Sequence, residues 1–418
     1  MRNFTFKGLF LTAVFMLLGC FSIQAADDDL ITKQITINLD KAGTLPNKIA
    51  SSEMYKITNL KIIGEINGTD WNMIREMAGR DNRGYGTEGK LSVLDLSEAK
   101  IVKGGDSYYS GDNCYTSNDE IGEYAFKDCS RLTSLTLPVG ITSIGYDAFA
   151  YCSGLTSLTL PAGITSIGEY AFYGCSGLTS LTLPAGITEI GESTFSDCSG
   201  LTSLTLPDGI TSIGISAFAY CSGLTSLNLP AGITSIDKYA FLDCSGLTSL
   251  TLPDGITSIG SRAFYGCSGL TSLTLPAGIT SIDKCAFSGC SRLTSLTLPA
   301  GITSIGEFAF SYCSGLTSIY VYAEKVPRIG RYAFEGCASR KCTLYVPKGT
   351  YDNYRLSEFG YFENIVEFDA TGIDKTTTST DVEEVSRYSL NGQRLAVPVK
   401  GLNIVKYSDG SARKVVVK

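Results

Sequence analysis

The hydrophobic and polar positions in the middle of the chain follow an order that repeats every 23 residues. One unit, from Ile167 to Glu189, reads IGEYAFYGCSGLTSLTLPAGITE. In the unit before it, the spacing L-x-x-L-x-L ends in Leu158 and Leu160. Alternate side chains of a strand face opposite ways, so these leucines are predicted to point inward and Ser157 and Thr159 outward.

The rest of each unit also has a predicted shape. Pro161-Ala162-Gly163 is typical of a turn. A second short extended piece is expected between Ile164 and Ile167. Some units carry Asp at the position of Gly168, and Asp tolerates left-handed φ, so a bend is predicted there. Ala171-Phe172 is expected to begin a short helical or 3-10 turn that leads to the next strand.

Nine copies hold this frame and a tenth is degraded. A unit of this size cannot bury its apolar face alone, so neighbouring coils must stack with strands about 4.8 Å apart. The pattern predicts a β-rich solenoid with capping regions and a small C-terminal β domain. The expected divisions are 1–25 (signal peptide), 26–120 (N-terminal cap with a divergent repeat), 121–318 (23-residue repeats), 319–368 (degraded repeat and C-terminal cap), 369–384 (linker) and 385–418 (β domain).

The order IG-x-x-AF-x-x-C-x-x-L-x-x-L-x-LP, from about 121 to 368, resembles the BspA-like leucine-rich repeat family. The resemblance implies a leucine-rich-repeat solenoid. It also implies a bacterial surface protein of the adhesin type, which binds host matrix or other cells.

The N-terminal flank carries weaker patterns. Ile31 to Leu39 alternates like an edge strand, and Asp70 is a candidate cap for a helix over 71–78 that Gly79 ends. The segment from Lys103 to Glu120 is expected to be an irregular, solvated loop. A divergent coil is predicted at Leu91, Leu94 and Leu96.

The C-terminal flank predicts a last strand at Leu344–Gly349 and a closing helix at Tyr351–Phe359. Beyond the Thr-rich linker, Asn391-Gly392 and Asp409-Gly410 are hairpin turn motifs between alternating apolar runs. The segment from Tyr388 onward resembles the C-terminal sorting domain of the type IX secretion route. The alternative is a small β domain without a sorting role.

The first residues resemble an export signal, with Arg2 and Lys7 ahead of an apolar run over 8–18. One interpretation is a lipobox that would place a lipid on Cys20. The favoured one is cleavage before Ala26, because small residues lie at that cut and acidic residues follow it. We therefore expect an exported protein at the cell surface, associated with the outer membrane, or extracellular.

Composition narrows the function classes. The 418 residues carry a net charge of -7 and a pI of about 4.9, which disfavours binding to nucleic acids. The absence of histidine excludes Ser-His-Asp and Cys-His catalysis and imidazole metal sites. No paired acid and base stands out, so we expect a binding protein, with no enzyme activity, metal or cofactor.

The cysteines form a regular column. Stacked ladder residues lie too far apart for disulfides, so a buried packing role is expected. Cys285 lies in a variable slot and is expected to be partly exposed, while Cys337 and Cys342 could pair in the cap. The column comprises Cys129, Cys152, Cys175, Cys198, Cys221, Cys244, Cys267, Cys290 and Cys313.

Two surfaces are candidates for binding. One is the outward rows of the strands, where the alternative is a solvated hydroxyl ladder, and the other is the variable strip with its tyrosines. Expected partners are extracellular matrix or cell-surface proteins, with membrane contact only through a lipid on Cys20. A passive spacer protein without a ligand is the alternative. The candidate residues are Ser157, Thr159, Ser180, Thr182, Ser203, Thr205 and Asn228 on the strands, and Tyr173, Tyr220 and Tyr265 on the strip.

Overall fold

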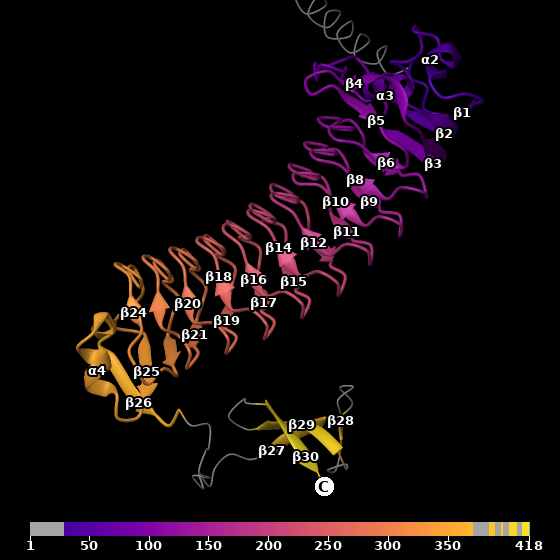
Figure 1. Cartoon of the computed structure of the whole chain (residues 1–418). Helices are drawn as coiled ribbons and strands as arrows, with labels where there is room; N and C mark the ends of the chain where they lie inside the picture. Colours follow the sequence, from indigo (N-terminus) through magenta and orange to yellow (C-terminus); the bar gives the residue numbers. More distant parts are fainter. Residues whose placement is uncertain (1–28, 371–383, 389–393, 396–400, 408–411, 418) are drawn as a thin grey trace, which may run out of the picture. The chain divides into compact units, whose positions relative to one another are not determined.

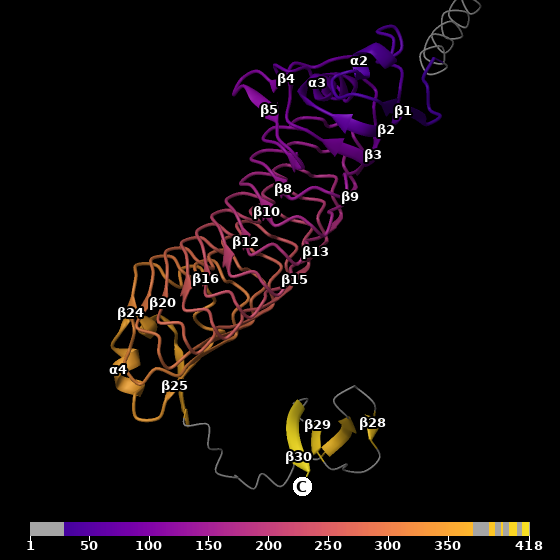
Figure 2. The same ribbon diagram turned by 45° about the vertical axis from the view of Figure 1, so that its right-hand side comes forward.

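The computed structural model describes residues 29–370, 384–388, 394–395, 401–407 and 412–417. These residues fall into two units, 1–368 and 369–418, which are described separately. The predicted signal segment, with Cys20 and Ala26, and most of the expected linker lie outside the described residues. Figures 1 and 2 show the described part of the first unit as an elongated, gently curved stack of coils.

Each repeat contributes one strand to a parallel ladder, as the leucine spacing predicts. Ser180, Leu181 and Thr182 pair with Ser203, Leu204 and Thr205 of the next coil, one full repeat away. The strands are β7 (Ser134–Thr136), β9 (Ser157–Thr159), β11 (Ser180–Thr182), β13 (Ser203–Thr205), β15 (Ser226–Asn228), β17 (Ser249–Thr251), β19 (Ser272–Thr274), β21 (Ser295–Leu298) and β23 (Ser318–Val321).

Parallel pairing continues into both flanks. β1 (Ile35–Leu39) pairs with β2 (Asn59–Ile66), and β2 pairs with β3 (Val93–Ile101), which pairs with β7. At the other end β23 pairs with β25 (Thr343–Pro347), which pairs with β26 (Asn364–Phe368). The expected edge strand and divergent coil are therefore present as β1 and β3.

A second ladder runs along another side of the coils, where the second extended piece was expected. Its two-residue strands pair in parallel, for example Glu189–Ile190 with Ser212–Ile213. They are β6 (Glu120–Ile121), β8 (Ser143–Ile144), β10 (Ser166–Ile167), β12 (Glu189–Ile190), β14 (Ser212–Ile213), β16 (Ser235–Ile236), β18 (Ser258–Ile259), β20 (Ser281–Ile282), β22 (Ser304–Ile305) and β24 (Arg328–Ile329).

The third side differs from the prediction of a helical turn. Its backbone bonds to the next coil: the N–H of Phe172 donates to the carbonyl of Thr194 at 2.9 Å, and the N–H of Gly174 donates to that of Ser196 at 2.8 Å. Left-handed φ angles of 57° at Tyr170 and 68° at Gly174 make this possible. The prediction of a left-handed bend at Gly168 was wrong.

Gly168 instead allows neighbouring coils to stack closely. A Cβ there would lie 2.7 Å from the backbone carbon of Gly145 in the preceding coil. The glycine therefore permits a close approach of two backbones.

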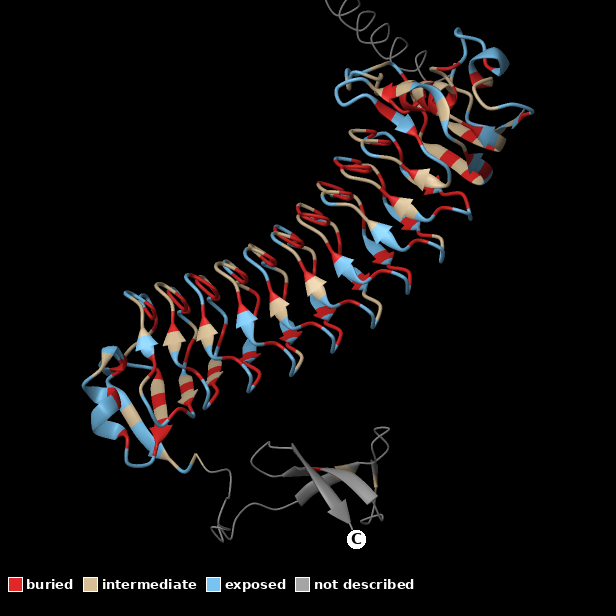
Figure 3. Cartoon of the chain, viewed as in Figure 1, coloured by how far each residue is buried: buried red, intermediate tan, exposed pale blue. Residues whose placement is uncertain are grey.

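A column of phenylalanine rings fills the interior between coils. Successive rings stack with centroids 5.1–5.7 Å apart and interplanar angles of 1–17°. Figure 3 shows buried positions alternating with exposed ones along the coils. The column comprises Phe126, Phe149, Phe172, Phe195, Phe218, Phe241, Phe264, Phe287, Phe310 and Phe334.

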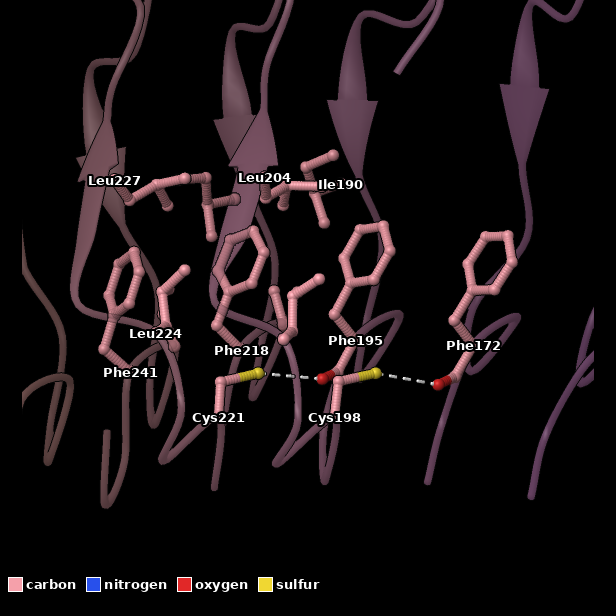
Figure 4. Close-up of a cluster of buried hydrophobic side chains, with 14 of the residues drawn as sticks. Phe172, Ile190, Phe195, Cys198, Leu204, Phe218, Cys221, Leu224, Leu227 and Phe241 are labelled. Carbon is pink, nitrogen blue, oxygen red and sulfur yellow. Dashed lines mark hydrogen bonds between the residues drawn. The ribbon is translucent and has the colours of Figure 1, made fainter. Parts of the chain in front are cut away.

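The cysteine column lies beside these rings, buried and unpaired as expected. Each thiol from Cys152 onward donates to the carbonyl of the phenylalanine in the preceding coil. Cys198 Sγ reaches Phe172 at 3.1 Å, and Cys221 Sγ reaches Phe195 at 3.0 Å (Figure 4). The thiol is thus both a packing group and a hydrogen-bond donor between coils.

The structure also tests the expected exposure of Cys285 and whether Cys337 pairs with Cys342. Cys285 is buried, with 7% of its surface exposed, so the expectation of partial exposure was wrong. Tyr332 occupies the same slot with a similar left-handed φ of 58° and is 58% exposed, so the burial of Cys285 reflects its short side chain. Cys337 and Cys342 are free thiols and form no disulfide.

The N-terminal end of the ring column is closed by Trp71. This residue lies on α3 (Gly68–Met77), 5.1 Å from the ring of Phe126, and its indole N–H donates to the carbonyl of Ala125 at 2.9 Å. The N-cap of α3 is Asn67, and Asp70 accepts its backbone N–H from the third helical position. The helix thus begins earlier than predicted.

The expected loop over Lys103–Glu120 is largely an ordered hairpin. β4 (Gly104–Tyr109) pairs with β5 (Cys114–Thr116) and packs against α3, while α2 (Leu45–Lys48) lies nearby. Tyr108 is buried and its hydroxyl donates to the carbonyl of Glu123 at 3.0 Å.

The C-terminal end of the column is closed by Phe359 and Phe362, whose rings lie 5.5 and 5.3 Å from Phe334. The predicted closing helix is two pieces, α4 (Tyr351–Arg355) and the 3-10 helix η1 (Glu358–Tyr361). In the part of the chain that the structure describes, no helix is long and apolar enough to cross a membrane.

The second unit contains an antiparallel sheet in the order β28-β27-β29-β30. β27 pairs with β28, and β29 pairs with β30, as the two hairpin motifs predict. The turn residues themselves lie outside the described residues. The strands are β27 (Glu384–Tyr388), β28 (Arg394–Leu395), β29 (Gly401–Tyr407) and β30 (Ala412–Val417).

The buried thiols predict a stability that falls at alkaline pH. Burial raises the pKa of Cys175 and Cys221 to about 12 and that of Cys129 to about 11, whereas an exposed thiol titrates near about 8.5. Between these values the unfolded chain has lost protons that the folded chain keeps. Stability is therefore fully present below about pH 8.5 and lost as pH rises toward the folded pKa values.

Urea unfolding midpoints across this alkaline range test the linkage. The triple variant Cys129→Ala, Cys175→Ala, Cys221→Ala should be less stable at neutral pH but should lose stability less steeply as pH rises. Equal slopes for the variant and the unmodified protein would contradict the assignment.

Candidate interaction surfaces

The outward rows of the strand ladder are exposed as predicted. Their side chains form no hydrogen bond within the protein at Ser157, Thr159, Ser180, Thr182, Ser203, Thr205 or Asn228, all of which the structure describes. These hydroxyl and amide groups are free to bind water or a partner.

The neighbouring threonine column has a different role. Thr179 Oγ1 donates to the carbonyl of Thr156 at 3.3 Å, and Thr202 Oγ1 donates to that of Thr179 at 3.0 Å. The same bond recurs along most of the ladder. Threonine hydroxyls just before most strands therefore form hydrogen bonds between coils, whereas the hydroxyl of the serine that follows, as at Ser180 and Ser203, forms none.

The outward rows carry no ionisable side chain between β7 and β21. A shallow hollow of about 430 Å³ lies between β9 and β11 and is lined by both rows and by the leucines beneath them. It contains no acid, base or nucleophilic thiol. The geometry offers an extended polar surface, with nothing that positions a reacting group.

The sequence reasoning missed an aromatic end to the Thr row. Tyr320 pairs with Thr297 and with Tyr345, and the two tyrosine rings stack with centroids 4.4 Å apart. Phe368 packs edge-on against Tyr320. The sequence indicated this only by the tyrosines that replace threonine at this position in the degraded units.

The predicted tyrosines lie on the third side of the coils, in the ladder that contains the left-handed residues. Tyr220 and Tyr265 are exposed by 44% and 38%, while Tyr173 is half-buried against Tyr151 at 5.1 Å. They do not join the Ser and Thr rows, because the two sets belong to different ladders. The chain therefore presents two separate surfaces.

No group of three or more Cys, Asp or Glu residues with metal-binding geometry is found within the described ranges. The thirteen described cysteines, which carry the strongest ligand chemistry, are all buried.

Residues 119–248 and 234–354 match the BspA type leucine rich repeat region, in six copies, and together span more than half of the chain. The chain belongs to the BspA-type leucine-rich repeat family. No curated protein matches it. In this family the coil is a repeat scaffold for protein interaction, a fold that is typically non-enzymatic.

Solved structures include similar leucine-rich repeat proteins. One from Bacteroides ovatus is 24% identical, with 67% of this chain and 89% of that one covered and a TM-score of 0.37. One from T. pallidum is 32% identical, with 39% and 75% covered and a TM-score of 0.35. A leucine rich cell surface protein from Faecalibacterium prausnitzii is 24% identical, with 61% and 88% covered and a TM-score of 0.30.

The two hydroxyl columns of this BspA-type protein predict mutational effects of different size. Changing Thr156, Thr179 and Thr202 to Val removes three inter-coil hydrogen bonds and should lower the free energy of unfolding by about 2 kcal/mol. Changing the adjacent Ser157, Ser180 and Ser203 to Ala should cost less than about 1 kcal/mol. Urea unfolding of both triple variants checks this, and equal losses would refute the division of roles.

Proposed function

We propose that this protein is a cell-surface adhesin whose solenoid binds extracellular matrix or cell-surface proteins. The observation that carries the proposal is the outward face of the strand ladder from β9 to β19, where the Ser and Thr side chains of consecutive coils are exposed and form no hydrogen bond within the protein. Uniform, uncharged rows of this kind suit many weak contacts along one partner.

Repetition converts such contacts into useful affinity. Once one coil has bound, the next coil meets the same partner at high effective concentration, so avidity grows with the number of coils. A long or multivalent glycoprotein fits this geometry better than a small molecule, because the hollow on this face is shallow and open.

Removing coils in pairs tests the proposal. Deletion of 213–258, or of 236–281, takes out two whole units and restores the repeat frame. Binding to immobilised collagen, laminin or intact epithelial cells should weaken by a similar, partial amount in both deletions, with the chain still folded by circular dichroism.

Two results would argue against it. Complete loss of binding from a single change such as Ser203→Ala would indicate one discrete site. Absence of saturable binding by the unmodified protein to every matrix protein and cell type would favour the passive spacer.

We also propose that the C-terminal unit directs the protein to the cell surface through type IX secretion. Its support is the four-stranded antiparallel sheet, a separate unit from the solenoid, and the terminal KVVVK motif. Deleting residues 388–418 should leave the protein in the periplasm, as measured by protease accessibility of intact cells. Unchanged surface display would contradict the sorting role.

A further inference from the structure

The near-identical coils act as internal controls for one another. A residue type that recurs at a slot in every coil is needed for the fold, whereas one confined to a few coils serves something else. The coils that contain Cys198 and Cys290 have no tyrosine in their turns, yet they keep the same stacked phenylalanine and thiol hydrogen bond. The solenoid therefore does not need tyrosines in this segment.

Five tyrosines nevertheless gather on the turns of three adjacent coils, in an arrangement named here the tyrosine patch. Their rings touch in sequence, with centroids 5.1–5.9 Å apart. Tyr109 of the β4–β5 hairpin stacks on one end of the row at 4.6 Å. The tyrosine patch comprises Tyr124, Tyr146, Tyr170, Tyr173 and Tyr151.

The backbone makes these aromatic residues unfavourable for stability. Tyr124, Tyr151 and Tyr170 have left-handed φ angles of 57°, 60° and 57°. Glycine and aspartate adopt this conformation most readily, and they occupy the slot of Tyr151 in most other coils. Tyr151 is also 47% exposed, so burial offsets little of this cost.

Carboxylates surround the patch. Residues 122–198 contain seven acidic side chains and two basic ones, a net charge of -5. Glu123 and Glu169 occupy the same slot as Tyr146 in the coils on either side of it, are exposed, and form no ion pair in the described structure. An aromatic ring therefore lies between two free carboxylates, about 4.8 Å per coil away.

The protein itself shows how a cation sits on these rings. Lys127 Nζ lies 5.0 Å from the centroid of Tyr124 while it pairs with Asp147 at 2.5 Å. Elsewhere in the solenoid Arg262 lies over Tyr239 at 5.7 Å. A ring face next to a carboxylate binds a lysine or arginine head through cation–π attraction and charge together.

From these observations we infer that the tyrosine patch, with Glu123 and Glu169, is the docking site for a segment of a partner protein rich in lysine and arginine. This rests on the proposed binding function and adds to it a second surface with its own chemistry. The neutral strand rows would give avidity along the partner, and the patch would select basic partners.

The test replaces patch residues by those that other coils carry at the same slots. Tyr146→Ser copies Ser261, Tyr170→Ser copies Ser216, and Tyr151→Gly copies Gly289. The full chain is titrated against a fluorescein-labelled peptide of alternating lysine and glycine, and anisotropy is read. The triple variant should bind about tenfold more weakly than the unmodified protein.

Two further variants separate the charges from the rings. Glu123→Gln with Glu169→Gln should weaken binding at low salt and reduce its salt dependence, because the carboxylate attraction is screened. The matched control, Tyr312→Gly with Tyr332→Ser, makes the same kinds of change at residues that are 59% and 58% exposed, outside the patch. Its affinity should change less than about twofold.

Several outcomes would overturn the inference. The unmodified protein could fail to bind the basic peptide, or the control variant could lose as much affinity for it as the patch variant does. The protein could also bind a neutral glycan such as mannan, through the same tyrosines, in place of the peptide. If the patch variants bind matrix proteins as well as the unmodified protein does, while the coil deletions weaken that binding, the inference fails and the proposed function stands. If the patch variants lose binding while the coil deletions keep it, the inference is supported and the role proposed for the strand rows fails.

Discussion

Contact between one coil and the next holds this protein together. A single coil has one stacked ring, one buried thiol and a few leucines and isoleucines, which is too little apolar surface to offset the entropy of ordering its backbone. Stability therefore arises where Phe195 stacks between Phe172 and Phe218, and where Cys221 donates to the carbonyl of Phe195. The same rule requires that both ends of the column be covered, by Trp71 at one end and by Phe359 and Phe362 at the other.

Because contacts between coils come mainly from the interior, residues on the outer surface of the coils are less constrained by the fold. Because the inward positions and the threonine column before each strand supply most contacts between coils, the residues of the outward strand rows and the turn slots can vary while those contacts are kept. The strand rows stay uniform and neutral, whereas the turns vary from Tyr146 to Ile215 to Lys284. Chemical variety thus lies on one side of the coil and regularity on another.

The regular features could be predicted from sequence because each depends on a short period. L-x-x-L-x-L fixes which side of a strand is buried, and the 23-residue step predicts a stacked column of unpaired cysteines. The turn side could not be predicted this way. Its left-handed residues are tyrosine, serine or arginine more often than glycine, since hydrogen bonds to the next coil impose the conformation whatever the side chain.

Other misses also have their origin in the three-dimensional structure. Cys285 is buried because its side chain is too short to reach the surface from a slot where Tyr332 is exposed, and the Lys103–Glu120 segment forms a hairpin because α3 supplies a surface for it. The patch formed by Tyr146 and Tyr170 with their neighbours needed coordinates, because spacing along the chain places these residues a repeat apart without showing that their rings touch.

Hydrogen exchange followed by mass spectrometry on Phe218→Ala is the most direct measurement of whether coils depend on their neighbours. Removing this ring breaks stacking contacts at 5.7 Å with Phe195 and at 5.3 Å with Phe241. The account predicts faster exchange in the turn segments of the coils on both sides as well as in the mutated coil, with the C-terminal sheet unchanged. Loss of protection confined to the mutated coil would show that each coil is stable by itself and would contradict the account.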